Sequence, residues 1–191
     1  MRSRQSGHDD ATQAPSRVDR GGRSVTKPLL TDDRITELLN GEKPISAADE
    51  QRLRRKGRPK QNRAFSEAQV EIVADGRFFR IYVQRHNSNA LQFSIQLVYV
   101  DADGNEYRLL RLAGRTGPHT NELERVKGRD SGRVTDRFRV NRLTERYQAS
   151  DYEDDGFAEA AGGRFSDFES AFEALRDIGG VTWPTPQGKL F

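Results

Sequence analysis

The fold is decided by the stretch VEIVADGRFFRI, residues 70–81. Apolar and polar side chains alternate on both sides of Asp75-Gly76, a dipeptide that favours a two-residue hairpin turn. Counting outward from this turn places Ile72 opposite Phe79 on one face, and an acidic residue opposite a basic one on the other. Because the turn and the alternation give the same register, we predict an antiparallel β-hairpin.

The residues that follow predict a second hairpin and a further strand. Four apolar side chains alternate along the outgoing strand, at Phe93, Ile95, Leu97 and Tyr99. A turn in residues 101–105 leads to a return strand over residues 107–112. Residues 113–137 lack this alternation, and its loss predicts a long loop. A fifth strand is expected over residues 137–143.

A helix closes the predicted domain. Its start is indicated by a capping box of Ser166 with Glu169, and Gly179-Gly180 ends it. Its apolar side chains recur at helical spacing, at Phe168, Ala171, Phe172 and Leu175. The predicted fold class is therefore α+β, with an antiparallel sheet of about five strands and the C-terminal helix packed on one face.

The rest of the chain is expected to flank this domain. Residues 1–28 carry few bulky apolar side chains and are predicted to be a disordered basic tail. Residues 29–65 contain two short helices, one capped by Thr31 and one running from Ser46 to about Arg55, followed by a basic linker. The α+β domain then covers residues 66–180, and residues 181–191 form a tail whose Trp183 either docks or frays.

The composition excludes several classes of chemistry. The 191 residues include no cysteine, so there is no disulfide, thiolate metal site or cysteine nucleophile. Only three histidines occur, and we expect no metal site and no cofactor. The sequence has no apolar run of about 18 residues, and 32% of it is charged, which predicts a soluble cytoplasmic protein with no membrane partner.

The sharpest charge feature is a basic arm over residues 52–63, with seven cations and no acid. These cations are Arg52, Arg54, Arg55, Lys56, Arg58, Lys60 and Arg63. Gly57 and Pro59 break a helix, so the arm is predicted to be extended and able to follow a phosphate backbone. Within it, Lys56-Gly57-Arg58-Pro59-Lys60 resembles the AT-hook, a short DNA-binding motif, and that resemblance implies insertion of arginine into the minor groove.

A second constellation predicts phosphate chemistry. GRTGPHTN, residues 114–121, precedes FRVNRLTERY, residues 138–147, which we predict to continue as a strand from Arg139 to Tyr147. This arrangement gathers His119, Arg142, Glu145, Arg146 and Tyr147 at one sheet edge. Such residues can move protons and stabilise a phosphorane without a metal, as in RNA cleavage.

The order of these features over about residues 66–180 resembles a family of uncharacterised prokaryotic and phage proteins, a domain of unknown function. The resemblance implies that His119 groups with the strand that starts at Arg139. The family pattern has a His-x-His pair where this chain has Arg139 and Asn141, so two-histidine metal chemistry is not expected here. The resemblance implies no activity.

Three functions follow from these patterns. The leading hypothesis is a nucleic-acid-binding protein, with RNA favoured over DNA, that acts as an accessory factor of a mobile or defence element. The second is a protein-interaction module of toxin–antitoxin type, which holds a protein partner through the acidic residues 151–159 or a sheet edge. The third is a small metal-independent ribonuclease built on His119 and the residues grouped with it.

Overall fold

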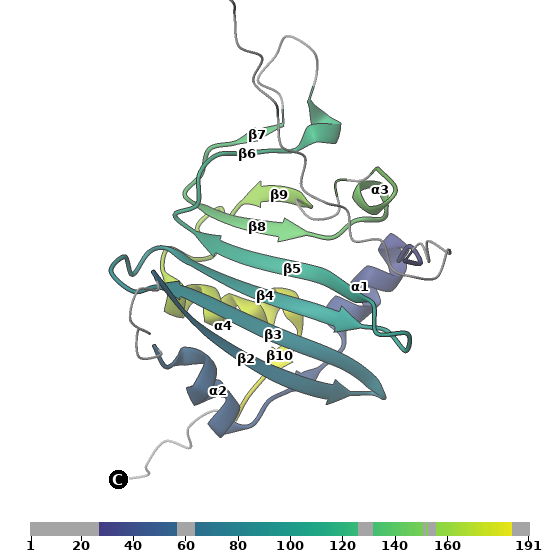
Figure 1. Ribbon diagram of the computed structural model, residues 1–191. Coiled ribbons are helices and arrows are strands. Elements are labelled where there is room, and N and C mark those ends of the chain that lie inside the picture. Colours follow the sequence, from purple (N-terminus) through teal and green to yellow (C-terminus); the bar gives the residue numbers. More distant parts are fainter. Residues whose placement is uncertain (1–26, 57–63, 126–131, 151, 153–155, 185–191) are drawn as a thin grey trace, which may run out of the picture.

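A six-stranded antiparallel sheet forms the centre of the molecule, with the strand order β2-β3-β4-β5-β8-β9 (Figure 1). The computed structural model describes residues 27–56, 64–125, 132–150, 152 and 156–184. The sheet strands are β2 (Phe65–Ala74), β3 (Arg77–His86), β4 (Phe93–Val100), β5 (Glu106–Gly114), β8 (Phe138–Arg142) and β9 (Phe157–Ala160). Two short strand pairs accompany the sheet: β1 (Lys43–Pro44) runs parallel to β10 (Val181–Thr182), and β6 (His119–Thr120) runs antiparallel to β7 (Arg133–Val134).

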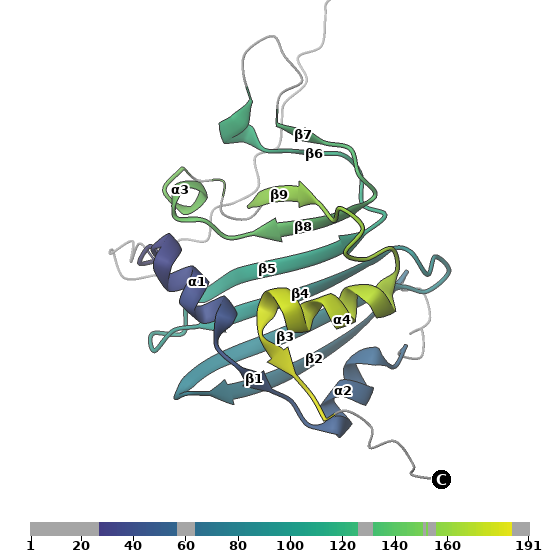
Figure 2. The same ribbon diagram turned by 180° about the vertical axis from the view of Figure 1, so that it is seen from behind.

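Three helices lie on one side of the sheet (Figure 2). They are α1 (Asp32–Asn40), α2 (Ala47–Arg54) and α4 (Phe168–Gly179). A short helix, α3 (Glu145–Gln148), follows β8, and a 3-10 turn, η1 (Glu122–Glu124), follows β6. The α+β class and the packing of the C-terminal helix on one face are therefore confirmed, and the sheet has six strands where about five were predicted.

The predicted register of the first hairpin is confirmed. Ile72 pairs with Phe79, and Glu71 pairs with Arg80, whose Nε donates a hydrogen bond to the Glu71 carboxylate at 3.2 Å. The turn requires two successive residues in the left-handed region, and Asp75 and Gly76 adopt φ of 49° and 69°. Local pairing rules were sufficient here because strand and turn are contiguous in the chain.

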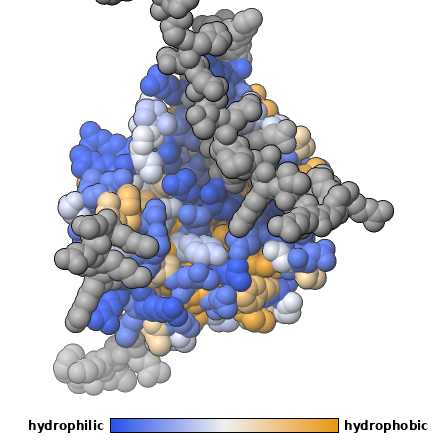
Figure 3. All heavy atoms as spheres, in the orientation of Figure 1, coloured by the Kyte–Doolittle hydropathy of each residue, from blue (hydrophilic) through white to orange (hydrophobic). Residues whose placement is uncertain are grey.

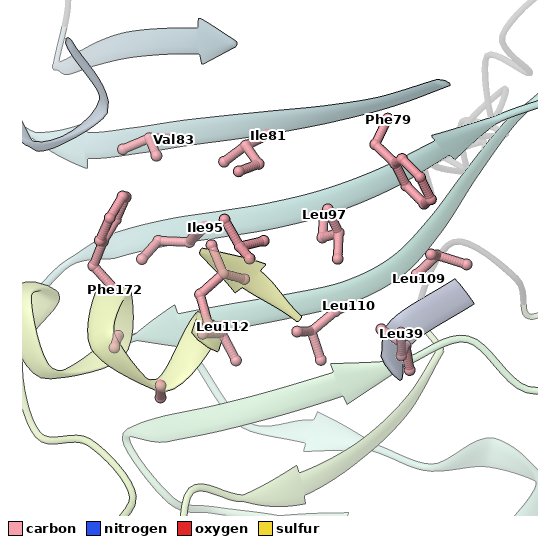
Figure 4. Packing of buried hydrophobic residues seen from close by; sticks show 14 of the residues in the cluster. Leu39, Phe79, Ile81, Val83, Ile95, Leu97, Leu109, Leu110, Leu112 and Phe172 are labelled. Carbon is pink, nitrogen blue, oxygen red and sulfur yellow. The ribbon is translucent and has the colours of Figure 1, made fainter. Parts of the chain in front are cut away.

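The hydrophobic core lies between the sheet and the helices (Figure 4). Phe172 of α4 is fully buried, and Ile72 and Phe79 are only 4% and 2% exposed, as predicted. The core also takes in side chains from the first two helices, from the segment between them and from the end of the described chain, namely Ile35, Leu38, Leu39, Ile45, Leu53, Val181 and Trp183. It therefore extends beyond residues 66–180 on both sides, and Trp183 docks against Phe172 with ring centroids 5.0 Å apart.

Three local predictions were wrong. The N-cap of α4 is Asp167, not Ser166, because the Asp167 carboxylate accepts the backbone N–H of Ser170 at 2.8 Å. The fifth strand, predicted over residues 137–143, is confirmed as β8, but its predicted continuation to Tyr147 is wrong, since Thr144 caps α3. Residues 113–137 are not a structureless loop throughout, because β6 and β7 pair within them.

Several predictions fall outside the described residues. They concern most of the 1–28 tail, the arm residues Arg58, Lys60 and Arg63, part of the acidic segment 151–159, and the last residues of the chain. Within the part of the chain that is described, no helix is long and apolar enough to cross a membrane.

Candidate nucleic-acid interface

The face of the sheet opposite the helices carries polar side chains in rows that cross the strands. The pairing places one row along Gln69, Tyr82, Gln96, Arg111, Asn141 and Ala158. The next row follows Glu67, Gln84, Ser94, Ala113, Arg139 and Ala160. Side chains two positions apart on a strand share a face, so both rows belong to the side that the described helices leave open. We call this side the open face, and its surface is largely hydrophilic (Figure 3).

Part of the open face and the exposed side of α2 border a concavity of about 1240 Å³. Its cationic lining consists of Lys27, Arg52, Arg55, Lys56 and Arg108. Two carboxylates also line it, Glu67 and Glu106. The balance of charge along this concavity is therefore positive, which favours an anionic ligand.

The two carboxylates are already engaged by neighbouring side chains. Glu106 forms an ion pair with Arg80 and accepts a hydrogen bond from the Tyr82 hydroxyl at 3.4 Å. Glu67 accepts a hydrogen bond from the Gln84 amide at 3.2 Å. These contacts reduce the ability of the two carboxylates to repel an anion in the concavity.

Three cations of the predicted basic arm lie together on the rim of this concavity. Arg52 is in the last turn of α2, and Arg55 and Lys56 directly follow it. All three are exposed, and among the described residues no carboxylate forms an ion pair with them. The arm is therefore helical as far as Arg54 rather than extended throughout, and the three charges lie in the last turn of α2 and in the two residues that follow it.

Arg54 belongs to the same predicted basic arm, but its side chain contacts α4 and does not line the concavity. Its guanidinium pairs with Glu50 at 2.9 Å, with Glu169 at 2.7 Å and with Glu173. It also lies 4.4 Å from the ring centre of Phe172. These contacts join α2 to α4 on the core side, and sequence spacing alone gave no signal for them.

The residues predicted for RNA cleavage are held by separate partners. His119 lies in β6 opposite Val134, and Arg142 is 3.6 Å from the Glu159 carboxylate. The backbone N–H of Glu145 donates to Asp32 at 2.8 Å. His119 therefore contacts β7, Arg142 contacts β9 and Glu145 contacts α1.

Arg146 and Tyr147 meet at Glu124, a residue that sequence reasoning missed. The Glu124 carboxylate pairs with Arg146 and accepts a hydrogen bond from the Tyr147 hydroxyl at 2.5 Å. Tyr147 is only 1% exposed, so its hydroxyl is held inside the protein. The ribonuclease hypothesis gains no support from these contacts, which instead attach η1 to α3.

A second missed residue, Asn121, fixes the segment that carries His119. Its amide donates to the carbonyl of Ala158 and accepts the N–H of the same residue, both at 2.8 Å. This paired contact attaches the end of β6 to the edge strand β9. Among the described residues, no group of three or more His, Asp or Glu side chains is placed to hold a metal ion.

Comparisons with known proteins give no relative. No family model, no curated protein and no solved structure matches the chain. The resemblance to an uncharacterised prokaryotic and phage family therefore stays a prediction, and the functional argument rests on the geometry described above.

Proposed function

We propose that the protein binds single-stranded nucleic acid, RNA in preference to DNA, in the concavity that residues of α2 and part of the open face both line. The observation that carries this proposal is the set of three exposed cations, Arg52, Arg55 and Lys56, on the rim of a polar sheet face. Cations on a helix beside such a face can contact successive phosphates, while the sheet contacts the bases.

The open face offers groups that suit an unpaired strand. Tyr82 of β3 lines the concavity and is partly exposed, and aromatic side chains on a sheet can stack with unpaired bases. The amides of Gln69, Gln84 and Gln96 line the same concavity and can each donate and accept hydrogen bonds. Base edges and ribose 2′-hydroxyls need such partners, and the latter distinguish RNA from DNA.

Salt dependence tests this proposal. Replacing Arg52, Arg55 and Lys56 together by Gln removes three phosphate contacts. The slope of log affinity against log salt should then become shallower by about 2, since each contact on a single strand contributes about 0.7. The measurement is fluorescence anisotropy with labelled single-stranded RNA, and with DNA of the same sequence, over a range of salt concentrations.

A matched control removes three charges elsewhere. The triple variant Arg34→Gln, Arg125→Gln and Arg164→Gln changes exposed or partly exposed arginines that do not line the concavity, and it should leave the slope nearly unchanged. Equal slopes in wild type and the Arg52, Arg55 and Lys56 variant would refute the proposal. So would a wild-type protein that fails to bind at low salt, in which case the protein-interaction hypothesis takes its place.

A further inference from the structure

The outer strand β2 has no strand on its far side in the part of the chain that the structure describes. It stands at one end of the strand order, and β3 is the strand that pairs with it (Figure 1). All ten residues of β2 take part in this pairing. An unpaired edge of this length presents a row of backbone N–H and C=O groups to which another extended chain can bind.

The register of the first hairpin shows which backbone groups of β2 point outward. Ala74 and Arg77 flank the two-residue turn, so they form a hydrogen-bonded pair. At the other end of the hairpin, the N–H of Asn87 donates to the carbonyl of Ala64 at 2.8 Å. The even-numbered residues of β2 therefore bond to β3, and the odd-numbered ones direct their backbone groups away from it. The outward groups belong to Phe65, Glu67, Gln69, Glu71 and Val73.

The opposite edge of the sheet is blocked, whereas the β2 edge is not. At β9, which has four residues, the Asn121 amide bonds both the N–H and the carbonyl of Ala158. Within the described ranges, no side chain and no backbone group outside the sheet bonds to the outward backbone groups of β2. One edge is thus closed to a further strand, and the other offers its hydrogen-bonding groups.

There is space for another strand beside β2. Ala68 and Gln69 both line the concavity, together with residues of α2. Since successive side chains of a strand point to opposite faces, the concavity extends along the strand edge between these faces. Towards the turn the edge remains accessible, because the side chain of Glu71 is 55% exposed and Val73 is 72% exposed.

The charge along this edge is negative. Residues 64–76 include Glu67, Glu71 and Asp75 and no cation. Glu71 shares Arg80 with Glu106, so this group of three retains one negative charge. Glu67 and Glu71 project from the same face of β2, four residues apart. Cations on an added strand, placed opposite these two carboxylates, would form favourable cross-strand pairs.

The same carboxylates disfavour a second copy of this chain as the added strand. A symmetric antiparallel pairing of two β2 strands centred on Gln69 places Glu67 opposite Glu71 of the other copy. Centred on Glu71, it places the two Glu71 side chains opposite each other, and centred on Val70 it leaves them diagonal. Like charges at such positions are destabilising, so the edge is suited to a strand of opposite charge.

We propose that β2 binds a basic, extended segment of a partner protein as a seventh, antiparallel strand along residues 67–73. Backbone hydrogen bonds supply the affinity, and the side chains supply the selection. Read from its N-terminus, the segment has an apolar residue opposite Val73, then a cation opposite Glu71 and a second cation opposite Glu67. This inference does not rest on the proposed nucleic-acid binding, although residues 67–69 border the same concavity.

A synthetic peptide tests the strand addition. Fluorescein-labelled Val-Thr-Arg-Thr-Gln-Thr-Arg, which has this pattern, is titrated with the full chain at low salt and followed by fluorescence anisotropy. N-methylation of its third and fifth residues removes the N–H groups that face β2, and should weaken binding at least tenfold, since about two hydrogen bonds are lost. N-methylation of its second and fourth residues removes N–H groups that face away, and should change the affinity by less than about threefold.

Variants of β2 separate the charge from the backbone. Glu71→Lys should weaken binding by roughly tenfold, and a peptide with Glu in place of its first Arg should bind this variant better than the original peptide does. Val73→Pro removes an outward N–H and leaves the bonds to β3, because proline is tolerated on edge strands. It should lower the affinity severalfold, whereas Val73→Thr, which keeps the N–H, should bind as the wild type does. Circular dichroism and thermal unfolding verify that each variant is folded.

The outcomes distinguish this site from the proposed function. The Arg52, Arg55 and Lys56 variant should still bind the peptide, and Val73→Pro should still bind RNA, since Val73 does not line the concavity. The inference is overturned if the wild type fails to bind the peptide at up to about 1 mM, or if both methylated peptides bind equally well. A dimer of the free wild type that Val73→Pro dissociates would assign the edge to a second copy and would overturn it too.

Discussion

Lys43 is a lysine in the interior of the protein, next to the C-terminal end of α1. Its side chain is fully buried, and its ammonium donates to the carbonyls of Leu39 and Gly41, at 3.1 and 2.5 Å. It also lies 5.1 Å from the ring centre of Phe79. The position satisfies carbonyls that the helix end leaves free, but it removes a charge from water.

The stability of the protein should rise as the pH increases from about 8 to 10.5. Burial, and then the charge of Arg77, lower the pKa of Lys43 to about 8 from its ordinary value of 10.5. Between these values the unfolded chain binds a proton that the folded chain has released, so stability increases with pH. The gain from this group is up to about 3 kcal/mol, and less if the two carbonyls favour the charged form.

Denaturant unfolding at several pH values measures this gain. Lys43→Met replaces the group by an uncharged side chain of similar length, and the difference between wild type and variant isolates its titration. The difference in free energy of unfolding should shift in favour of the wild type above pH 8. A difference that stays constant from pH 7 to 10.5 would show that Lys43 has an ordinary pKa.

At the scale of elements, the start of α4 shows a cap that sequence reasoning placed one residue early. Asp167→Ala removes the side chain that accepts the N–H of Ser170, and should lower the free energy of unfolding by about 1 kcal/mol. Ser166→Ala should cost much less, because among the described residues no hydrogen bond of its hydroxyl caps the helix. Thermal or urea unfolding of both variants checks this order, and equal losses would contradict the assignment of the cap.

How well each element could be predicted depended on how local its determinants are. The hairpin over residues 70–81 and the apolar stripe of α4 have a complete pattern within one short stretch, and both were predicted. The four-residue β9 has no such pattern, and its pairing with β8 is tertiary. The candidate site was also predictable only in part. The run of cations was visible in the sequence. That Arg54 contacts α4 while Arg55 lines the concavity depends on the packing of α2 against α4, which the sequence did not reveal.

At the scale of the whole molecule, Arg54 links the N-terminal helices to the C-terminal one. Arg54→Gln should lower the free energy of unfolding by about 1–2 kcal/mol, because it removes contacts with three carboxylates and with the ring of Phe172. Arg55→Gln, one residue later, should change it by less than about 0.5 kcal/mol. Urea unfolding measures both, and equal effects would show that the Arg54 contacts contribute nothing to stability.

The parallel pair of β1 with β10 also constrains how the protein is made. β1 pairs Lys43 with Val181, so a strand produced early in translation waits for a partner that leaves the ribosome much later. Until then α1 and α2 cannot bury Leu38 and Leu53 against the completed core. The nascent chain therefore carries the apolar face of α1, and Leu53 of α2, without their completed core through most of its synthesis, a state in which chaperones and proteases have access to them.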